Sequence, residues 1–334
     1  YTLSKCLEQV MKMSLKRRLL EKLSEDDFLS GEAFAKTQNV SRAAIWKAIK
    51  ALREEGYRIE AIPKKGYRLI KQGDYLETKA ILKHYHGKEK LTIELHESIT
   101  STNDRAKALA EAGAPEWTVI LSEMQSLGRG RLGKNFYSPK GGIYLSVILR
   151  PKLAVEKATL LTLLGATVVC EVIEETLTLK SQIKWVNDIF IEGKKVSGIL
   201  TEGSLSLESQ ILDYLVLGIG INITLDQNLP SELKTIVGSL FGEKTPPDDF
   251  RNYFIGTLLT KLSQYYMDFE KGEFIKNYRE RLMVLGKWVD LYQGKSVEAV
   301  KVLELDSKGA LIVETKEGLK KRVTSGEVSL RLKE

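Results

Sequence analysis

Cysteine and histidine are scarce in this chain of 334 residues, and their scarcity argues against two classes of protein. The two cysteines, Cys6 and Cys170, cannot form a disulfide framework, so we expect a protein of the reducing cytoplasm. The three histidines, His84, His86 and His96, do not combine with the cysteines in any metal-ligand spacing. The sequence therefore leaves metal ligands unassigned.

Long hydrophobic runs are absent as well. The longest charge-free apolar runs, near residues 158–170 and 214–225, fall short of the roughly 18 residues that a membrane-spanning helix needs. No secretory signal is visible at the N-terminus. A chain of this length and ordinary composition has room for two or three globular domains, and we expect no membrane partner.

The net positive charge is confined to one part of the chain. The formal net charge is +7. Residues 36–71 hold ten basic and three acidic side chains, a net +7, and the remaining residues balance at 41 basic against 41 acidic. A local excess of this kind is typical of a surface that binds nucleic acid.

The basic segment has the pattern of two short helices joined by a turn. Ser30 is a favourable N-cap for the first helix, and Ser41 is one for the second. Between them, Asn39 tolerates a left-handed backbone conformation. In the second helix Ile45 and Leu52 share one face at helical spacing, which leaves a polar face open. The pattern predicts a helix-turn-helix.

An alternating segment at residues 57–70 follows, and it predicts two strands around a turn at 63–66 that carries two lysines. The second helix can then lie in a major groove while the cationic turn meets phosphates. The side chains that we expect to contact DNA are Ser41, Arg42, Ala43, Trp46, Lys47, Lys50, Lys64 and Lys65. The open alternative is an amphipathic helical hairpin with a basic face that binds nothing.

The stretch GRGRLGKNFYSPKGG, residues 128–142, resembles two nucleotide-binding motifs. It satisfies the G-x-G-x-x-G pattern and nearly satisfies the phosphate-loop pattern. Both motifs require a helix directly after the glycines. Residues 136–139 and the two glycines that follow do not favour a helix, and Asn135 stands where magnesium would need a hydroxyl. We therefore predict a loop between two strands.

This segment, residues 128–134, is called the Gly-Arg loop below. Its glycines let the backbone approach a ligand closely. Its cations, Arg129, Arg131 and Lys134, suit a carboxylate or a phosphate. The alternative is a basic surface loop, and the density of glycine and arginine favours ligand binding.

Two later segments predict further strands. Residues 188–191 and 196–201 flank a turn at 192–194, and Lys184 lies just before this hairpin. Residues 214–224 predict a buried strand in which Gly218 and Gly220 permit close approach of a ligand or another backbone. Taken alone, Lys184 is equally a strand-end charge, and the two glycines are equally packing residues.

Together these segments resemble one family, the bifunctional biotin–protein ligases that also repress the biotin biosynthesis operon. The resemblance runs along essentially the whole chain. The matching blocks are the helix-turn-helix at 30–49, STN at 101–103, EMQ at 123–125, GRGRLGK at 128–134, KWVND at 184–188, KVSGIL at 195–200, GIGINI at 218–223 and GEVSLR at 326–331. Val186 departs from the family's usual proline, and Lys134 and Phe136 replace its arginine and tryptophan. The segment after Ile223 diverges, so the residues that contact adenine stay unassigned.

The resemblance implies an α+β multidomain fold with three parts. Residues 1–72 would form a winged helix-turn-helix. Residues 73–284 would form a mixed β-sheet with flanking helices, related to lipoate ligases and class II synthetases. Residues 285–334 would form a small SH3-like β-barrel, and the alternating pattern at 295–318 independently supports short antiparallel strands there.

The resemblance also implies an ATP-dependent reaction that forms biotinyl-5′-AMP and transfers biotin to a lysine. Two anions must meet in the first step, so Lys184, Arg129 and Arg131 are expected to be catalytic. The residues expected to bind biotin are Ser101, Thr102, Asn103, Gln125, Arg129, Gly130, Arg131 and Lys184. Those expected to bind the nucleotide are Gly128, Lys134, Asn187 and Asn222. Magnesium is expected with ATP, and Asp188 and Glu202 are considered as ligands without being assigned.

Three partners follow from the same resemblance. They are a biotin carboxyl carrier domain of acetyl-CoA carboxylase or a similar carboxylase, operator DNA, and a second copy of the chain in a homodimer favoured by biotinyl-AMP. Three alternatives stay open: a biotin-sensing repressor that no longer catalyses, a lipoate-type ligase with a fused DNA-binding domain, and a ligase whose winged domain serves only in oligomerisation.

Overall fold

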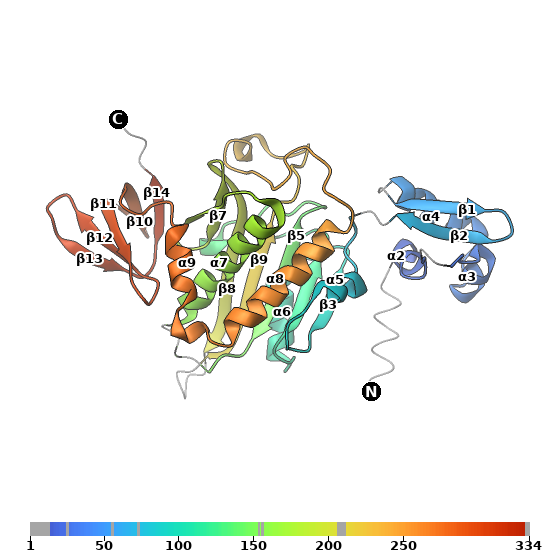
Figure 1. The fold of residues 1–334 in the computed structure, drawn as a ribbon, viewed down its shortest axis with the longest axis horizontal. Coiled ribbons are helices and arrows are strands. Elements are labelled where there is room, and N and C mark those ends of the chain that lie inside the picture. Colours follow the sequence, from blue (N-terminus) through green and yellow to red (C-terminus); the bar gives the residue numbers. More distant parts are fainter. Residues whose placement is uncertain are drawn as a thin grey trace. The chain divides into compact units, whose positions relative to one another are not determined.

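The computed structural model describes residues 14–24, 27–54, 57–71, 74–152, 154, 157–205 and 212–330. The chain divides into two compact units. One comprises Tyr1–Ala80 with Pro247–Asn252, and the other comprises Ile81–Pro246 with Tyr253–Glu334. Figure 1 gives the order of the elements. Cys6 and Arg331, the last residue of the final family block, lie outside the described residues.

The first unit is a winged helix-turn-helix. It contains α2 (Leu15–Leu20), α3 (Gly31–Thr37), α4 (Arg42–Glu54), β1 (Arg58–Ile62) and β2 (Gly66–Lys71). Both predicted caps are present: Ser30 Oγ accepts from the Ala33 amide at 3.3 Å, and Ser41 Oγ accepts from the Ala44 amide at 3.2 Å. Asn39 has the expected positive φ of 52°. Sequence-local capping thus fixes where both helices begin.

The core of this unit uses the predicted face of α4. Ile45 and Leu52 are buried, together with Leu19 of α2 and Phe34 of α3. Strands β1 and β2 pair antiparallel around the predicted turn. The opposite face of α4 is left to solvent.

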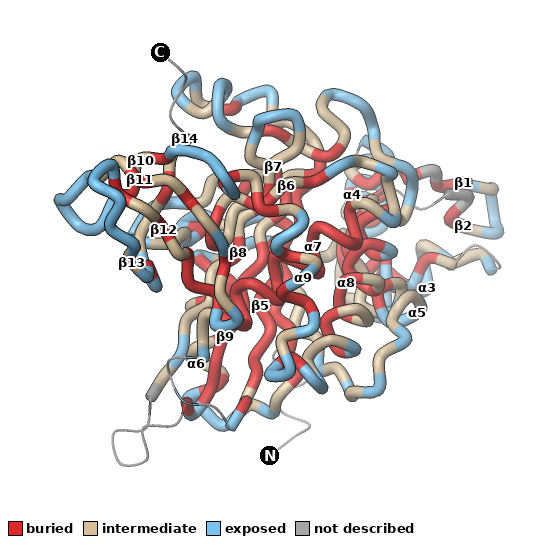
Figure 2. Tube along the Cα trace, turned by 60° about the vertical axis from the view of Figure 1, so that its left-hand side comes forward, coloured by how far each residue is buried: buried red, intermediate tan, exposed pale blue. Residues whose placement is uncertain are grey.

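The second unit is built on a seven-stranded mixed sheet in the order β3-β4-β5-β9-β8-β7-β6. The strands are β3 (Thr92–His96), β4 (Thr118–Ser122), β5 (Ile143–Leu149), β6 (Gln182–Lys184), β7 (Asp188–Ile191), β8 (Lys194–Leu205) and β9 (Leu212–Ile221). Strands β3 and β4 are parallel, and the other neighbours are antiparallel. Figure 2 shows β5 and β9 as buried strands.

Helices cover both faces of this sheet. The helices of the unit include α6 (Thr102–Glu111), α7 (Ala158–Leu177) and α9 (Phe274–Glu280), together with most of α5 (Thr78–His84) and α8 (Phe250–Tyr266), whose first three residues belong to the first unit. Val216 of β9 packs in a cluster with α6, whereas a side chain at Gly165 of α7 would meet Leu217. Since successive strand residues point to opposite faces, α6 and α7 lie on opposite faces. The site described below lies on the α6 face.

A five-stranded antiparallel sheet forms the C-terminal part of the second unit, where the barrel is expected. Its order is β13-β12-β11-β10-β14, from β10 (Trp288–Gln293), β11 (Ser296–Leu305), β12 (Leu311–Thr315), β13 (Lys320–Val323) and β14 (Glu327–Leu330). Gly309 and Gly318, with φ of 83° and 82°, lie at the β11–β12 and β12–β13 turns. Trp185 Nε1 donates to the Gly309 carbonyl at 3.0 Å, which ties this sheet to the KWVND segment.

In the described part of the chain, no helix combines the length and the apolarity that crossing a lipid bilayer demands.

Candidate active site

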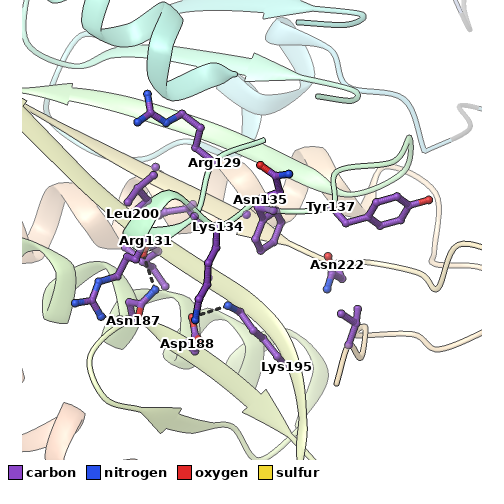
Figure 3. A pocket seen from close by; sticks show the side chains of 18 of the residues that line it. Arg129, Arg131, Lys134, Asn135, Tyr137, Asn187, Asp188, Lys195, Leu200 and Asn222 are labelled. Carbon is purple, nitrogen blue, oxygen red and sulfur yellow. Dashed lines mark hydrogen bonds and ion pairs between the residues drawn. The ribbon is translucent and has the colours of Figure 1, made fainter. Parts of the chain in front are cut away.

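A cavity of about 350 Å³ opens on the α6 face of the large sheet. Figure 3 shows the side chains that surround it. Residues from the Gly-Arg loop, the start of α6 and strands β6 to β9 line it. The expected ligand-binding residues that line it are Ser101, Thr102, Asn103, Gln125, Arg129, Gly130, Arg131, Lys134, Lys184, Asn187 and Asn222. The structure thus brings together segments that are up to 121 positions apart.

Gly128 is the exception among the expected ligand-binding residues, because it does not line the cavity. A side chain at this position would lie 2.4 Å from both the Phe136 carbonyl and Ser138 Oγ. The Gly128 carbonyl accepts from the Phe136 amide at 2.8 Å. Gly128 is therefore required by the packing at the base of the loop.

The Gly-Arg loop contains no helix beyond one 3-10 turn, Arg131–Gly133, as the sequence predicts. Its two arginines diverge in Figure 3, with Arg129 extending toward α6 and Arg131 toward the β6–β7 turn. Between them, Leu132 has a positive φ of 55° and is 73% exposed. The loop can consequently place a cation on each side of the cavity.

Arg129 is held by two carboxylates. Its Nη1 lies 2.5 Å from Asp104 Oδ1, and its Nη2 lies 3.3 Å from Glu202 Oε1. Partial burial by itself would raise the pKa of Asp104, but hydrogen bonds from Lys107 and Arg129 outweigh it and lower that pKa below its ordinary value. An anionic ligand must compete with these carboxylates for Arg129.

Two other cations lie across the cavity. Arg131 Nη1 donates to Asn187 Oδ1 at 3.2 Å, and Asn187 Nδ2 donates in turn to the Ile199 carbonyl at 2.9 Å. Lys184 lies at the end of β6 and lines the cavity half-buried. Among the described residues, its ammonium forms neither a hydrogen bond nor an ion pair, so it is available to an anion.

Lys134 joins the loop to the C-terminal sheet. Its Nζ lies 2.7 Å from both carboxylate oxygens of Glu327, at the start of β14. Both residues line the cavity. The small C-terminal sheet therefore contributes one wall of the site and a negative charge next to a residue expected to bind nucleotide.

The neutral residues expected to bind biotin form a network with one another. Gln125 Oε1 accepts from the amide and the hydroxyl of Thr102 at 2.8 and 3.1 Å. The Ser146 hydroxyl lies 2.8 Å from Thr102 Oγ1 and 2.6 Å from Asn103 Oδ1. Ser101 caps α6 through its own Oγ, which accepts from the Asp104 amide at 3.3 Å. The network holds these groups in fixed positions before a ligand arrives.

Glycines make the floor of the cavity. A Cβ on Gly218 would lie 2.0 Å from Asn103 Oδ1, and one on Gly220 would lie 2.5 Å from the ring of Phe136. Strand pairing places Gly218 opposite Ser146 and Gly220 opposite Gly198. Of the two open interpretations of these glycines, the structure supports packing, because protein side chains occupy the space that each Cβ would take.

Sequence reasoning missed several residues of the site. Ser146 and Lys195 were not considered, and Glu202 was considered only as a metal ligand. Tyr137 donates to Asp226 at 2.5 Å, and this contact raises the pKa of Tyr137 to about 12. Ser146 is the one small polar side chain in the apolar and aromatic strand β5, and this could have indicated it. The other contacts depend on strand order and carry no local signal.

The carboxylates near the cavity are the groups to consider as magnesium ligands. The described residues contain no group of three or more His, Cys, Asp or Glu side chains placed to hold a metal ion. Asp188 lines the cavity but lies 2.7 Å from Lys195 Nζ. Magnesium commonly binds through one or two carboxylates together with substrate phosphates, and the two carboxylates in the described lining of the cavity, Asp188 and Glu327, are each paired with a lysine.

The residues expected to contact DNA are all exposed in the first unit. Trp46 is 57% exposed, and its ring lies 6.0 Å from Lys50 Nζ. Lys64 and Lys65 lie at the tip of the β1–β2 turn. The open face of α4 and the cationic turn belong to the same compact unit.

Three family models match the chain in the order of its parts. They are an HTH domain at residues 16–68, the Biotin/lipoate A/B protein ligase family at 95–222, and the Biotin protein ligase C terminal domain at 286–331. The chain is 36% identical over 338 residues to the bifunctional ligase/repressor BirA of Bacillus subtilis, with 96% of this chain and 100% of the relative covered. This chain belongs to the biotin protein ligase family.

A second relative and a solved structure support this assignment to the family. Bifunctional ligase/repressor BirA of Escherichia coli is 30% identical, with 94% of this chain and 96% of the relative covered. Among solved structures, biotin protein ligase from Aquifex aeolicus in complex with biotin and ATP is 31% identical, with a TM-score of 0.57, and 72% of this chain and 98% of that chain are covered. The expected family and fold class are confirmed.

Proposed function

We propose that this family member is an ATP-dependent biotin–protein ligase that also represses biotin biosynthesis genes. One observation carries the proposal: Arg129, Arg131, Lys134 and Lys184 line a single cavity that also presents the neutral polar groups around Asn103. A carboxylate and a polyphosphate repel each other in water. A site that collects cations beside polar groups suited to a cyclic urea can hold both reactants together.

In the first step the biotin carboxylate attacks the α-phosphorus of ATP. A bond forms between a carboxylate oxygen and phosphorus, the bond to the leaving pyrophosphate breaks, and biotinyl-5′-AMP results. Lys184, which forms no ion pair among the described residues, is placed to stabilise charge on the oxygens of the attacked phosphate. Magnesium enters with ATP and shields its phosphates. Arg131 approaches from the loop side of the cavity.

In the second step a lysine amine of a biotin carboxyl carrier domain attacks the acyl carbon and displaces AMP, which leaves an amide. The mixed anhydride is also open to hydrolysis, so the site must keep water from it. The Gly-Arg loop lines the cavity and is tied to other lining residues by Arg131–Asn187 and Lys134–Glu327. These contacts support its role as the lid.

The repressor activity would belong to the first unit. Its exposed cations and Trp46 fit DNA, and biotinyl-5′-AMP would act as corepressor by favouring a homodimer. A homodimer carries two winged helices and therefore matches a two-fold operator. A carrier domain that needs biotin would consume the corepressor and relieve repression.

The direct test follows labelled biotin onto a purified carboxyl-carrier domain. We expect acid-stable label on the carrier only when ATP is present, and none on a carrier whose acceptor lysine is replaced by arginine. Release of pyrophosphate without carrier would show the first step alone. Biotin binding without pyrophosphate release would instead identify a sensor that does not catalyse.

A further inference from the structure

Glu202 of β8 lies beside the expected biotin-binding residues without being one of them. Its Oε2 accepts from Asn103 Nδ2 at 2.9 Å. Its Oε1 accepts from Lys107 Nζ at 3.0 Å and lies 3.3 Å from Arg129 Nη2. The side chain is 21% exposed, and two cations flank its charge. The carboxylate is therefore fixed in place on the cavity side that carries Asn103.

The surroundings of Asn103 allow its amide only one orientation. Nδ2 faces Glu202 Oε2 and, at 3.4 Å, the Leu200 carbonyl, and both of these groups only accept hydrogen bonds. Oδ1 receives the Ser146 hydroxyl at 2.6 Å. A reversed amide would set Oδ1 against a carboxylate and a carbonyl. Because Asn103 is 4% exposed, water cannot offset that repulsion.

This orientation decides what the cavity offers to a ligand. Asn103 Oδ1 lies directly above Gly218, where a Cβ would come within 2.0 Å, and both residues line the cavity. An amide oxygen accepts two hydrogen bonds, and the protein supplies at most one, because the single proton of the Ser146 hydroxyl is shared between Asn103 Oδ1 and Thr102 Oγ1. The group that meets Oδ1 from the cavity must therefore be a donor. A cyclic urea presents N–H there, whereas a dithiolane ring has none.

We propose that Glu202 is a positioning residue that determines specificity: it locks the Asn103 amide so that the site requires an N–H donor and selects a ureido ring over a dithiolane. The inference rests on the proposed function, and within that function it assigns to Glu202 the selection of biotin over lipoate. A buried acceptor left unpaired by the wrong ligand costs affinity. Glu202 would then act on biotin and leave ATP unaffected.

The first experiment measures pyrophosphate release by the full-length protein without carrier. For Glu202→Gln we expect the KM for biotin to rise about tenfold, with kcat and the KM for ATP changed less than twofold. In an Asn103→Ala background the same substitution should leave the biotin KM unchanged, because the amide that it orients is gone. A change in kcat or in the KM for ATP would overturn the proposal, and so would a change in the KM for biotin that persists in the Asn103→Ala background. Either result would indicate that Glu202 acts through Arg129 or magnesium.

The second experiment exchanges the carboxylate and the amide between positions 103 and 202. Its result comes from comparing a single variant with a double variant, so it does not depend on one variant alone. Asn103→Asp sets two carboxylates face to face and should raise the biotin KM more than tenfold. Adding Glu202→Gln supplies an amide donor to the new carboxylate and should recover at least tenfold of that loss. Failure of the exchange to recover biotin affinity in a folded double variant would contradict the orienting role.

Two competitors then separate donor recognition from general damage. Desthiobiotin keeps the ureido N–H groups, so its inhibition constant should rise in Glu202→Gln in parallel with the biotin KM. Lipoate lacks the donors, so its weak inhibition should not change. If Glu202→Gln weakened inhibition by desthiobiotin and by lipoate to the same extent, the inference would be overturned. If the unsubstituted protein released no pyrophosphate with biotin and ATP, the proposed function would fail instead.

Discussion

Arg131 of the Gly-Arg loop donates a hydrogen bond to Asn187 Oδ1 at 3.2 Å, and Asn187 is itself anchored by its donation to the Ile199 carbonyl. The loop is thus fastened to the β6–β7 turn, although 56 positions separate the two residues. Both residues line the cavity. This contact is the structural basis for treating the loop as a lid over a hydrolysable anhydride.

Removal of this fastening should loosen the lid. We expect Arg131→Gly still to form biotinyl-5′-AMP but to release it about tenfold to a hundredfold faster, because one charge-assisted hydrogen bond is lost and the loop gains backbone freedom. Filtration of the labelled adenylate after a single turnover measures the release. Leu132→Gly adds the same backbone freedom at the neighbouring position but keeps the Arg131 guanidinium, so this variant should retain the adenylate. Equal retention in the parent and in Arg131→Gly would disprove the lid.

Replacement of Lys184 tests the chemical step. Lys184→Gln should lower the rate of pyrophosphate release by about two to three orders of magnitude, which is typical of losing one preorganised charge at a transition state. Biotin binding, measured by calorimetry without ATP, should fall much less. Lys180→Ala removes an exposed lysine four positions earlier and serves as the control. If Lys184→Gln released pyrophosphate at a near-normal rate, Lys184 would have no role in the chemical step.

The winged unit makes a prediction that needs no operator sequence. Lys64 lies exposed at the tip of the wing with a φ of 68°. If it neutralises one phosphate, Lys64→Ala should reduce the slope of log K against log salt by about 0.9 on any duplex. Lys88→Ala, an equal charge change in the other unit, should leave the slope unchanged. The measurement is fluorescence anisotropy with a labelled duplex over a salt series.

Glu94 predicts a pH dependence of stability. Burial alone would raise its pKa, but hydrogen bonds from His96 at 2.6 Å and Arg105 at 2.7 Å outweigh burial and lower the pKa of Glu94 to about 2. A carboxyl whose pKa falls on folding stabilises the fold above its ordinary pKa of about 4.5, and this stabilisation is lost as pH falls toward 2.

Glu94→Gln should therefore reduce the free energy of unfolding at pH 7 by up to about 3 kcal/mol. The difference from the parent should shrink steadily below pH 4.5. Urea unfolding at pH 7, 4.5 and 3.5 measures it. Glu243→Gln, at an exposed position, is the control. A difference that stays constant over this range would show that the ion pair contributes nothing through ionisation.

The winged unit could be predicted almost completely because its signals are local. Ser30 and Ser41 cap the helices that follow them, Asn39 adopts the left-handed turn, and Ile45 and Leu52 form the buried face. Each of these features depends on neighbours within a few positions. Side-chain chemistry and backbone preference therefore fixed the result before any tertiary contact formed.

The cavity could be predicted only in part. Its residue types were identified, and Arg129, Arg131 and Lys184 line one cavity as expected. The sequence did not indicate that Gly128 packs behind the loop, or that Arg129 would be held by Asp104 and Glu202. Charged loop residues choose partners from whatever the fold brings near, and spacing along the chain does not encode that choice.

The sequence by itself determined the helix-turn-helix and wing, the strands on either side of the Gly-Arg loop, the hairpin after Lys184 and the chemical character of the site. Tertiary structure alone decided which groups meet: Asn103 and Glu202 are 99 positions apart, and Lys134 and Glu327 are 193 apart. The physical reason is strand order and register. A shift of one residue between β8 and β9 would turn Glu202 to the other face of the sheet, and only the packed core fixes that pairing.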